Sequence, residues 1–193
     1  MLPELSRRLA AFGLCALSFM GCAVAPSPPA RLGLKLAPAA LEASISLQQQ
    51  LVVERQGRTD TIDAALEVDG ERLDLVGLTL GQRVFALHYD GRELQSWRHP
   101  SMPPELRGED VLEDLQLTLW PASAIKQALP AGWRIEEMGR RRTLWLDETP
   151  VMMIDYSGEP RWLGRIAINN LRYQYRLTIL SVPAGSGCFI STS

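Results

Sequence analysis

A regular alternation of apolar and polar residues over positions 41–98 constrains the fold of this chain more than any other feature. Successive side chains of a β-strand point to opposite faces of a sheet, so this alternation predicts strands with one buried face. The first run places four apolar residues on one face: Ile45, Leu47, Leu51 and Val53. The dipeptides Asp69-Gly70 and Asp90-Gly91 favour tight hairpin turns. We therefore predict an antiparallel meander that continues through strands at Thr61–Val68, Glu71–Leu80, Gln82–Asp90 and Glu93–Arg98.

The period changes from two to about 3.6 residues after Pro103-Pro104. Over Gly108–Trp120 the apolar residues recur at helical spacing: Val111, Leu112, Leu115 and Leu119. Acidic residues gather at the N-terminal end of this segment, where the helix dipole favours negative charge. Proline is tolerated in the first turn of a helix, so Pro121 marks the start of a second short helix over Pro121–Leu129.

The remaining chain returns to the periodicity of strands. It predicts strands at Trp133–Met138, Arg142–Asp147, Val151–Tyr156 and Gly164–Ser181, of which the last has the most regular alternation. The order is strands, then helices, then strands, without single strands and helices in alternation. This order predicts an α+β fold in which the helices pack on one face of an antiparallel sheet.

The N-terminus has the features of an export signal. Arg7 and Arg8 precede an apolar run over Leu9–Met20, which stops at Gly21-Cys22. A positive segment, an apolar core and a small residue at the cleavage site define such a signal. The cysteine after the small residue resembles a lipobox, which predicts cleavage after Gly21 and acylation of Cys22. An ordinary secretory signal is the alternative, whereas a spanning anchor is disfavoured because the run is shorter than the roughly 20 residues that a spanning helix needs.

This signal divides the chain into three parts. Residues 1–21 are the predicted signal peptide, residues 22–40 an acylated and proline-rich tether, and residues 41–193 a single domain. Cleavage removes one acidic and two basic residues, so the formal net charge moves from −2 to −3. Such a chain gives no support for nucleic-acid binding, which draws on lysines and arginines. Besides the acylated cysteine only Cys188 is left, so we expect no intramolecular disulfide.

Motifs for catalysis or metal binding are missing from the sequence. The two histidines are His88, in an ordinary strand pattern, and His99, at the start of a proline-rich loop. Zinc sites need several Cys, His or carboxylate ligands at workable spacing. Neither such a set, nor a serine-nucleophile motif, nor a phosphate-binding glycine loop occurs. We therefore expect no catalytic residue, no metal and no cofactor.

Two groups of charged residues are predicted to lie at the surface. The acidic pairs Glu113/Asp114 and Glu136/Glu137 are adjacent in sequence, so their side chains diverge and solvent is their expected environment. The run Arg140–Arg142 predicts an exposed turn between strands. The alternative for this run is a patch that binds lipid phosphates or an acidic partner.

Large apolar side chains are the main candidates for function. Six of them are predicted to line a hydrophobic cavity: Trp120, Trp133, Trp145, Met152, Tyr173 and Tyr175. Methionine adapts to irregular apolar ligands, and a curved sheet lined in this way and covered by two short helices would leave room for an acyl chain. Periodicity does not distinguish such a cavity from a filled core.

Two segments carry a family resemblance: Glu113–Pro121, which contains Asp-Leu-Gln-Leu and Trp-Pro, and Gly164–Leu180, which contains Asn169-Asn170 and Tyr173. They resemble small bacterial lipoproteins of unassigned function, often encoded with aryl-polyene and fatty-acid-like biosynthetic genes. Those proteins look like the lipoprotein-localisation carrier and receptor (LolA/LolB-like). The resemblance implies a strongly curved, unclosed antiparallel barrel with helices over its mouth and a cavity for acyl chains.

The resemblance carries one functional residue across, Cys22 as the acylation site. The receptor's membrane-inserting loop with an exposed leucine has no counterpart that the sequence identifies. Ala23 follows the cysteine where an aspartate would retain the protein at the inner membrane, which implies the periplasmic face of the outer membrane.

These observations favour a non-enzymatic outer-membrane lipoprotein that binds or transfers an acylated cargo: a lipid, a lipoprotein acyl chain or a polyene lipid. Its partners would be the membrane, through the lipid anchor, and the acyl ligand. The main alternative is a scaffold lipoprotein with a filled core that binds an envelope or biosynthetic protein. An acyl transferase or hydrolase is the third hypothesis.

Overall fold

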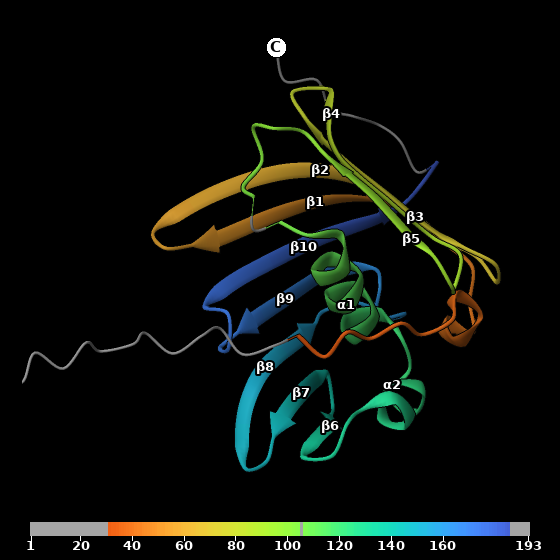
Figure 1. The fold of residues 1–193 in the computed structure, drawn as a ribbon, viewed down its shortest axis with the longest axis vertical. Helices are drawn as coiled ribbons and strands as arrows, with labels where there is room; N and C mark the ends of the chain where they lie inside the picture. Colours follow the sequence, from red (N-terminus) through yellow and green to blue (C-terminus); the bar gives the residue numbers. More distant parts are fainter. Residues whose placement is uncertain (1–30, 105, 186–193) are drawn as a thin grey trace, which may run out of the picture.

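The computed structural model describes residues 31–104 and 106–185. These residues form a ten-stranded antiparallel sheet, two α-helices and a short 3₁₀ helix, η1 (Pro38–Leu41) (Figure 1). The strands before the helices are β1 (Ile45–Arg55), β2 (Arg58–Val68), β3 (Leu73–Thr79), β4 (Gln82–Tyr89) and β5 (Leu94–Arg98). The helices α1 (Gly108–Leu119) and α2 (Ala122–Ala128) follow. The strands after them are β6 (Trp133–Met138), β7 (Arg141–Leu146), β8 (Thr149–Tyr156), β9 (Gly164–Asn170) and β10 (Tyr175–Pro183).

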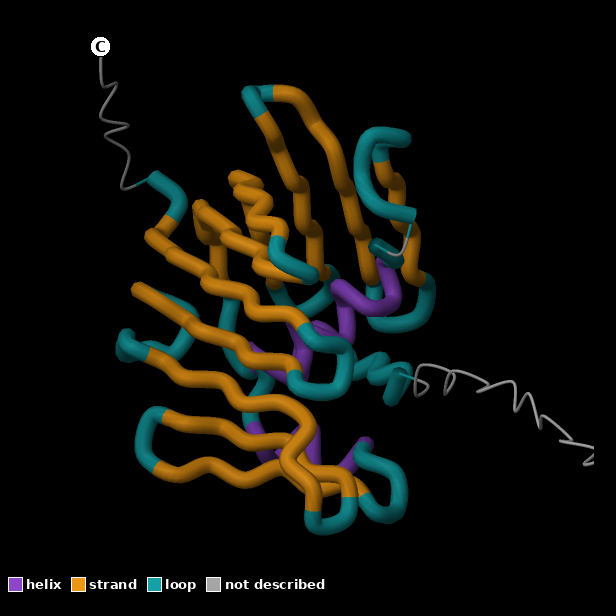
Figure 2. The backbone as a smooth tube through the Cα atoms, turned by 90° about the vertical axis from the view of Figure 1, so that its left-hand side faces the viewer, coloured by secondary structure: helices purple, strands orange, loops and turns teal. Residues whose placement is uncertain are grey.

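The strand order is β5-β4-β3-β2-β1-β10-β9-β8-β7-β6. Each half of the chain forms a meander, and the pairing of β1 with β10 joins the two halves. Within the described residues β5 and β6 end the sheet and do not pair with each other, so the barrel is not closed. The sheet curves around the helices, which lie on one side of it (Figures 1 and 2). The predicted α+β class, with a curved and unclosed antiparallel sheet, is confirmed.

The core lies between this sheet and α1. The inward residues of α1 belong to the same buried cluster as the inward residues of both meanders. A Cβ atom at Gly108 would lie 2.5 Å from the Cβ of Ser96. Glycine therefore permits the first residue of α1 to approach β5 closely.

The predicted long strand Gly164–Ser181 is wrong in one respect. The structure divides it into β9 and β10, joined by a turn at residues 171–174. Gln174 has a positive φ of 55°, which no strand residue adopts. The alternating pattern continues through the turn, so periodicity alone gave no sign of the break, and Tyr173 lies in the turn rather than on a strand.

Candidate functional site

Residues 31–37, which we call the strap, lie against α1 on the side away from the sheet. The backbone N–H of Gly33 donates to Glu113 Oε2 at 2.6 Å. The side-chain amide of Gln116 bonds the backbone of Leu36 in both directions, accepting from its N–H at 3.0 Å and donating to its carbonyl at 2.9 Å. These bonds satisfy polar groups that are buried together.

Trp120, just after α1, completes the attachment of the strap. Its indole Nε1 donates to the carbonyl of Ala37 at 3.1 Å, and its ring is fully buried. Residues 31–37 of the predicted tether 22–40 are therefore not a free linker, because they pack on the domain. The first half, with Cys22, lies outside the described residues, as do the signal peptide and Cys188.

Arg31 begins the strap and faces three carboxylates of α1. Its guanidinium lies 3.1 Å from Asp114, 3.4 Å from Asp110 and 4.0 Å from Glu113. Its guanidinium carbon also lies 3.9 Å from the ring centre of Tyr173, a distance at which a cation and an aromatic ring attract each other. One cation thus joins α1 to the β9–β10 turn.

Asp114 connects this cluster to the sheet. The hydroxyl of Tyr175, at the start of β10, donates to Asp114 Oδ2 and accepts from the side-chain amide of Asn170 at 3.1 Å. Asn170 in turn accepts from the backbone N–H of Tyr173 at 2.9 Å. A chain of hydrogen bonds therefore runs from the strap through α1 to the last two strands.

Burial raises the pKa of both adjacent carboxylates of α1. The pKa of Asp114 is raised to about 6, because desolvation outweighs the opposing effects of Arg31 and Tyr175. The pKa of Glu113 is also raised by burial, against the bond from Gly33 and the charge of Arg31. The prediction that this pair is solvated is wrong: the strap covers that side of the helix, and Glu113 is only 3% exposed.

The C-terminal end of α1 is held by a buried arginine. Arg142 of β7 has no exposed surface and donates to the carbonyls of Leu117 and Thr118 at 2.6 and 3.3 Å. The hydroxyl of Tyr156 donates to Thr118 as well, at 2.6 Å. The last carbonyls of a helix lack partners within it, and the dipole there favours positive charge. The predicted exposed turn is therefore wrong for Arg142.

Glu137 balances the charge of this buried arginine. Its Oε1 accepts from Arg142 Nη2 and from Arg161 Nη1, both at 2.6 Å. Although burial raises it, the two arginines hold the pKa of Glu137 below its usual value. The other two arginines of the run are exposed: Arg140 donates to the carbonyl of Ser157 and Arg141 pairs with Asp155.

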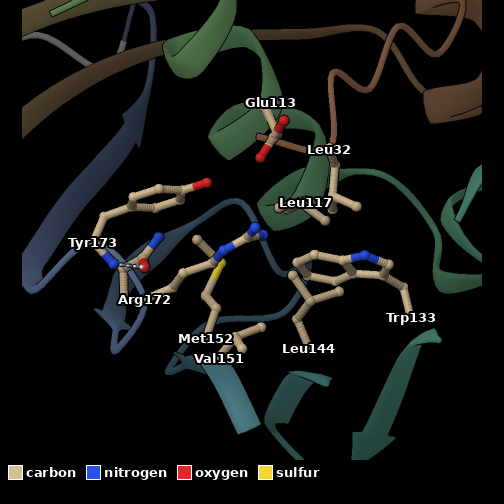
Figure 3. A pocket seen from close by; sticks show the side chains of 10 residues that line it. Leu32, Glu113, Leu117, Trp133, Leu144, Val151, Met152, Arg172 and Tyr173 are labelled. Atoms are coloured by element: carbon tan, nitrogen blue, oxygen red, sulfur yellow. Dashed lines mark hydrogen bonds between the residues drawn. The ribbon is translucent and has the colours of Figure 1, made fainter. Parts of the chain in front are cut away.

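The structure brings three of the six predicted cavity residues together. Trp133, Met152 and Tyr173 line a cavity between α1, the strap and strands β6–β9 (Figure 3). Its volume is about 10 Å³, which is close to the space that one water molecule needs. Asn170 also borders this cavity.

The other three predicted residues lie elsewhere. Trp120 fills the core at the end of α1. Trp145 pairs with Arg134 across β6 and β7, and the guanidinium carbon lies 4.4 Å from its ring centre. Tyr175 borders a second, open hollow of about 540 Å³ between two hairpin turns. That the six residues contact a ligand stays a prediction.

Sequence reasoning missed the strap and an exposed leucine. Leu80, in the β3–β4 turn, is 98% exposed and has a φ of 50°. A bulky residue in the left-handed region is uncommon and disfavoured. The only signal was the Thr-Leu-Gly-Gln string between two predicted strands. The polar positions Glu113, Asp114 and Gln116 of the family motif were visible, but nothing showed what covers them.

The two histidines take ordinary positions. His88 Nδ1 lies 2.7 Å from Asp74 on the neighbouring strand, and His99 Nδ1 lies 2.7 Å from the hydroxyl of Ser101 in a loop. Over residues 31–104 and 106–185 no group of three or more His, Cys, Asp or Glu side chains is arranged to hold a metal ion. No helix in that part of the chain has the length and apolar character to cross a membrane.

Comparison with known proteins shows the family. The model of the family described as "Protein of unknown function (DUF3261)" matches residues 46–183, so the chain belongs to this family. The match begins inside β1 and ends with β10, and it includes the whole of α1. No curated protein matches the sequence.

Two solved structures are similar at a low level. The Pseudomonas aeruginosa MucA/MucB complex aligns with a TM-score of 0.44 and 15% identity, over 79% of this chain and 56% of that chain. A DUF1329 family protein from Desulfovibrio piger aligns with a TM-score of 0.27 and 11% identity, over 81% of this chain and 92% of that chain.

Proposed function

We propose that this protein is a non-enzymatic envelope lipoprotein that binds an acyl chain between its sheet and α1, which acts as a movable lid. The observation that carries this proposal is the position of α1: it covers an apolar, curved sheet face and is attached by polar contacts at its outer side and at its end. The LolA/LolB-like likeness of the sequence and acylation of Cys22, which would place the protein at the periplasmic face of the outer membrane, belong to the same proposal.

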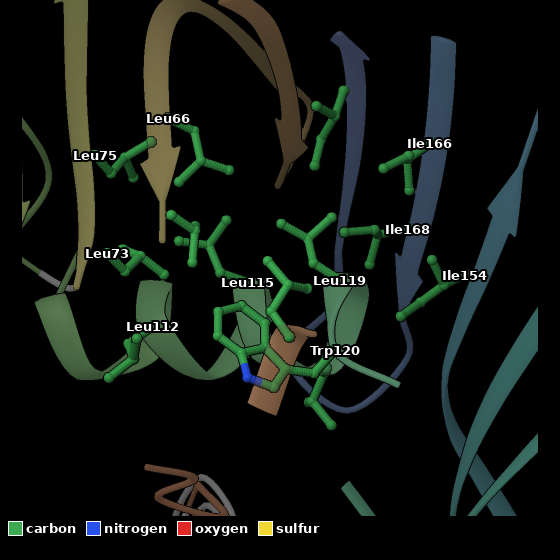
Figure 4. Close-up of a cluster of buried hydrophobic side chains, with 14 of the residues drawn as sticks. Leu66, Leu73, Leu75, Leu112, Leu115, Leu119, Trp120, Ile154, Ile166 and Ile168 are labelled. Carbon is green, nitrogen blue, oxygen red and sulfur yellow. The ribbon is translucent and has the colours of Figure 1, made fainter. Parts of the chain in front are cut away.

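The contacts of the inner face of α1 can be replaced by a lipid. Leu112, Leu115 and Leu119 pack near Leu66, Leu73, Ile154, Ile166 and Ile168 of the sheet (Figure 4). The hydrophobic effect is not directional and depends on the apolar area removed from water. An acyl chain that lies between α1 and the same sheet residues would therefore keep both apolar faces covered.

The polar contacts of α1 can be replaced by water. The bonds from Gln116 and Glu113 to the strap have a net value of about 0.5–1.5 kcal/mol each, because water satisfies the same groups once they are exposed. In this proposal the cavity of about 10 Å³ beside α1 belongs to the closed state of the lid. Opening also breaks the bonds from Arg142 and Tyr156 to the last carbonyls of α1. The acyl chain must therefore supply the free energy of this step through its higher affinity for the open state.

Leu80 is the proposed membrane contact. An exposed leucine at an unfavourable φ gives the folded domain no burial, so its side chain is available to a lipid surface. We expect Leu80→Gly to relieve the backbone strain and to reduce binding to vesicles. Leu180, which is 44% exposed on β10, supplies the control substitution Leu180→Ala.

The proposal is tested with the full chain carrying Cys22→Ser, exported and purified without detergent. We expect native mass spectrometry to show a lipid adduct, or calorimetry to show binding of dodecanoic acid. The variant Gln116→Met weakens the strap; if this shifts the lid equilibrium by about 1 kcal/mol, the apparent affinity rises about fivefold. Gln95→Met, on the exposed edge strand β5, is the matched control. A clean apo mass and no binding by any of the three proteins contradict the proposal.

A scaffold is the second candidate function, and the filled concave side favours it. The cavity beside α1 holds about 10 Å³, and Leu180 and Val182 leave apolar surface on β10. A scaffold would bind one stoichiometric protein partner without any change at α1. Crosslinking in the envelope, combined with the acyl-binding measurement above, separates the two functions.

A further inference from the structure

We infer that the open hollow between the β1–β2 and β9–β10 turns binds the phosphate group of a lipid. This inference rests on the proposed function, because it places the head group of the cargo at the mouth of the space that α1 covers. The two turns lie side by side since β1 pairs with β10, with Arg55 opposite Tyr175 and Glu54 opposite Arg176 (Figure 1).

The charges around the hollow match a phosphate. Its lining contains the three arginines Arg55, Arg58 and Arg176 against one acidic residue, Glu54. Asp60, outside the lining, lies 4.0 Å from Arg58, and both side chains are more than half exposed, so their attraction is weak. Arginine presents a planar set of donors that fits phosphate oxygens.

The hollow lies directly beside the inner cavity. Asn170 borders both spaces, and Tyr175 borders the outer one. These two residues are hydrogen-bonded to each other, and Tyr175 also bonds Asp114 of α1. When α1 moves away, this wall loses its attachment to the lid. A lipid with its phosphate in the hollow would then extend its chain toward Met152 and Trp133.

The hollow also lies at the end of the sheet that carries Leu80. Strands β1 and β3 run in the same direction, and β10 runs against them, so the β1–β2, β3–β4 and β9–β10 turns share one end. Leu171, 44% exposed, contributes an apolar side chain to the hollow itself. An exposed leucine beside arginines, as at Leu171, suits the boundary between lipid head groups and acyl chains.

The test compares two short-chain lipids that differ in the phosphate. The full chain with Cys22→Ser is titrated with dioctanoyl phosphatidic acid, dioctanoylglycerol and inorganic phosphate. The triple variant Arg55→Gln/Arg58→Gln/Arg176→Gln is compared with a control of equal charge change, Arg92→Gln/Arg107→Gln/Lys126→Gln. Since each cation near a lipid phosphate favours binding, we expect at least a tenfold preference for phosphatidic acid, which the triple variant loses and the control keeps.

The other outcomes separate this inference from the proposed function. Equal binding of the two lipids, unchanged in the triple variant, overturns the phosphate site and leaves acyl binding intact. If neither lipid binds, both the phosphate site and the proposed acyl binding are overturned. Binding of inorganic phosphate as tight as that of phosphatidic acid shows an anion site unconnected with lipid and also overturns the inference.

Discussion

The two faces of α1 differ in the kind of interaction that holds them. The inner face contributes leucines to the core, whereas the outer face contributes Glu113, Asp114 and Gln116 to a strap of extended backbone. Apolar burial of the inner face supplies stability but little positional specificity. The outer face supplies directional bonds to named atoms. Removing an inner contact should therefore lower the stability of the whole domain, whereas removing an outer contact should loosen the strap while the sheet stays folded.

The largest effect is expected from the inner face. Leu119→Ala removes a side chain that is 2% exposed, and such truncations cost about 2–5 kcal/mol because a cavity remains. We expect this loss in the free energy of unfolding measured by urea denaturation. Leu80→Ala, at a fully exposed position, is the control and should change the free energy of unfolding by less than about 0.5 kcal/mol.

Arg142 tests the attachment at the end of the helix. Arg142→Met keeps the volume but leaves the carbonyls of Leu117 and Thr118 without these donors, and we expect a loss of about 3 kcal/mol. The exposed neighbour Arg141, changed to Met, loses one surface ion pair and should cost less than about 1 kcal/mol. Equal effects of the two substitutions in the same urea titration would contradict the role of Arg142.

Gln116 tests the strap itself. Gln116→Met removes both bonds to Leu36 and should destabilise the strap by about 1–3 kcal/mol. Hydrogen exchange should become faster at Gly33 and Leu36, while the amides of β1 and β10 keep their protection. Uniformly faster exchange throughout the sheet would show that strap and core form one cooperative unit.

The pH dependence of Asp114 is the smallest expected effect. Its pKa of about 6 in the folded protein is above the usual value of about 3.9. The folded state therefore binds the proton more tightly, and stability rises as the pH falls through 6 toward 4. Between pH 7.5 and 5 we expect a gain of about 1 kcal/mol from this group. Asp114→Asn should remove this gain in thermal or urea unfolding and leave only the contribution of Glu113, whose pKa burial also raises. An unchanged pH profile in this variant would assign the whole effect elsewhere.

Periodicity was sufficient for most of the fold. The alternation over residues 41–98 and the helical spacing over 108–120 describe β1–β5 and α1 closely, because one buried face leaves a simple pattern. The β9–β10 turn was missed because its residues continue the alternation. The pairing of β1 with β10 joins residues more than a hundred positions apart, which no local pattern records.

The candidate site could be predicted from the sequence less well than the fold. Glu113 and Asp114 were predicted to be surface residues because their partners, Gly33 and Arg31, lie about 80 positions away in a proline-rich segment. Arg142 lies in an arginine run whose other members are exposed, and its burial depends on the carbonyls at the end of α1. Tertiary contact alone distinguishes these residues from their neighbours.

In the proposed function α1 is a lid that an acyl chain displaces. Hydrogen–deuterium exchange of the full chain with Cys22→Ser, with and without saturating dodecanoic acid, measures this displacement. We expect the amides of residues 112–119 and of the strap to lose protection when the ligand binds, while β1 and β10 stay protected. Bound dodecanoic acid with α1 as protected as before would contradict it.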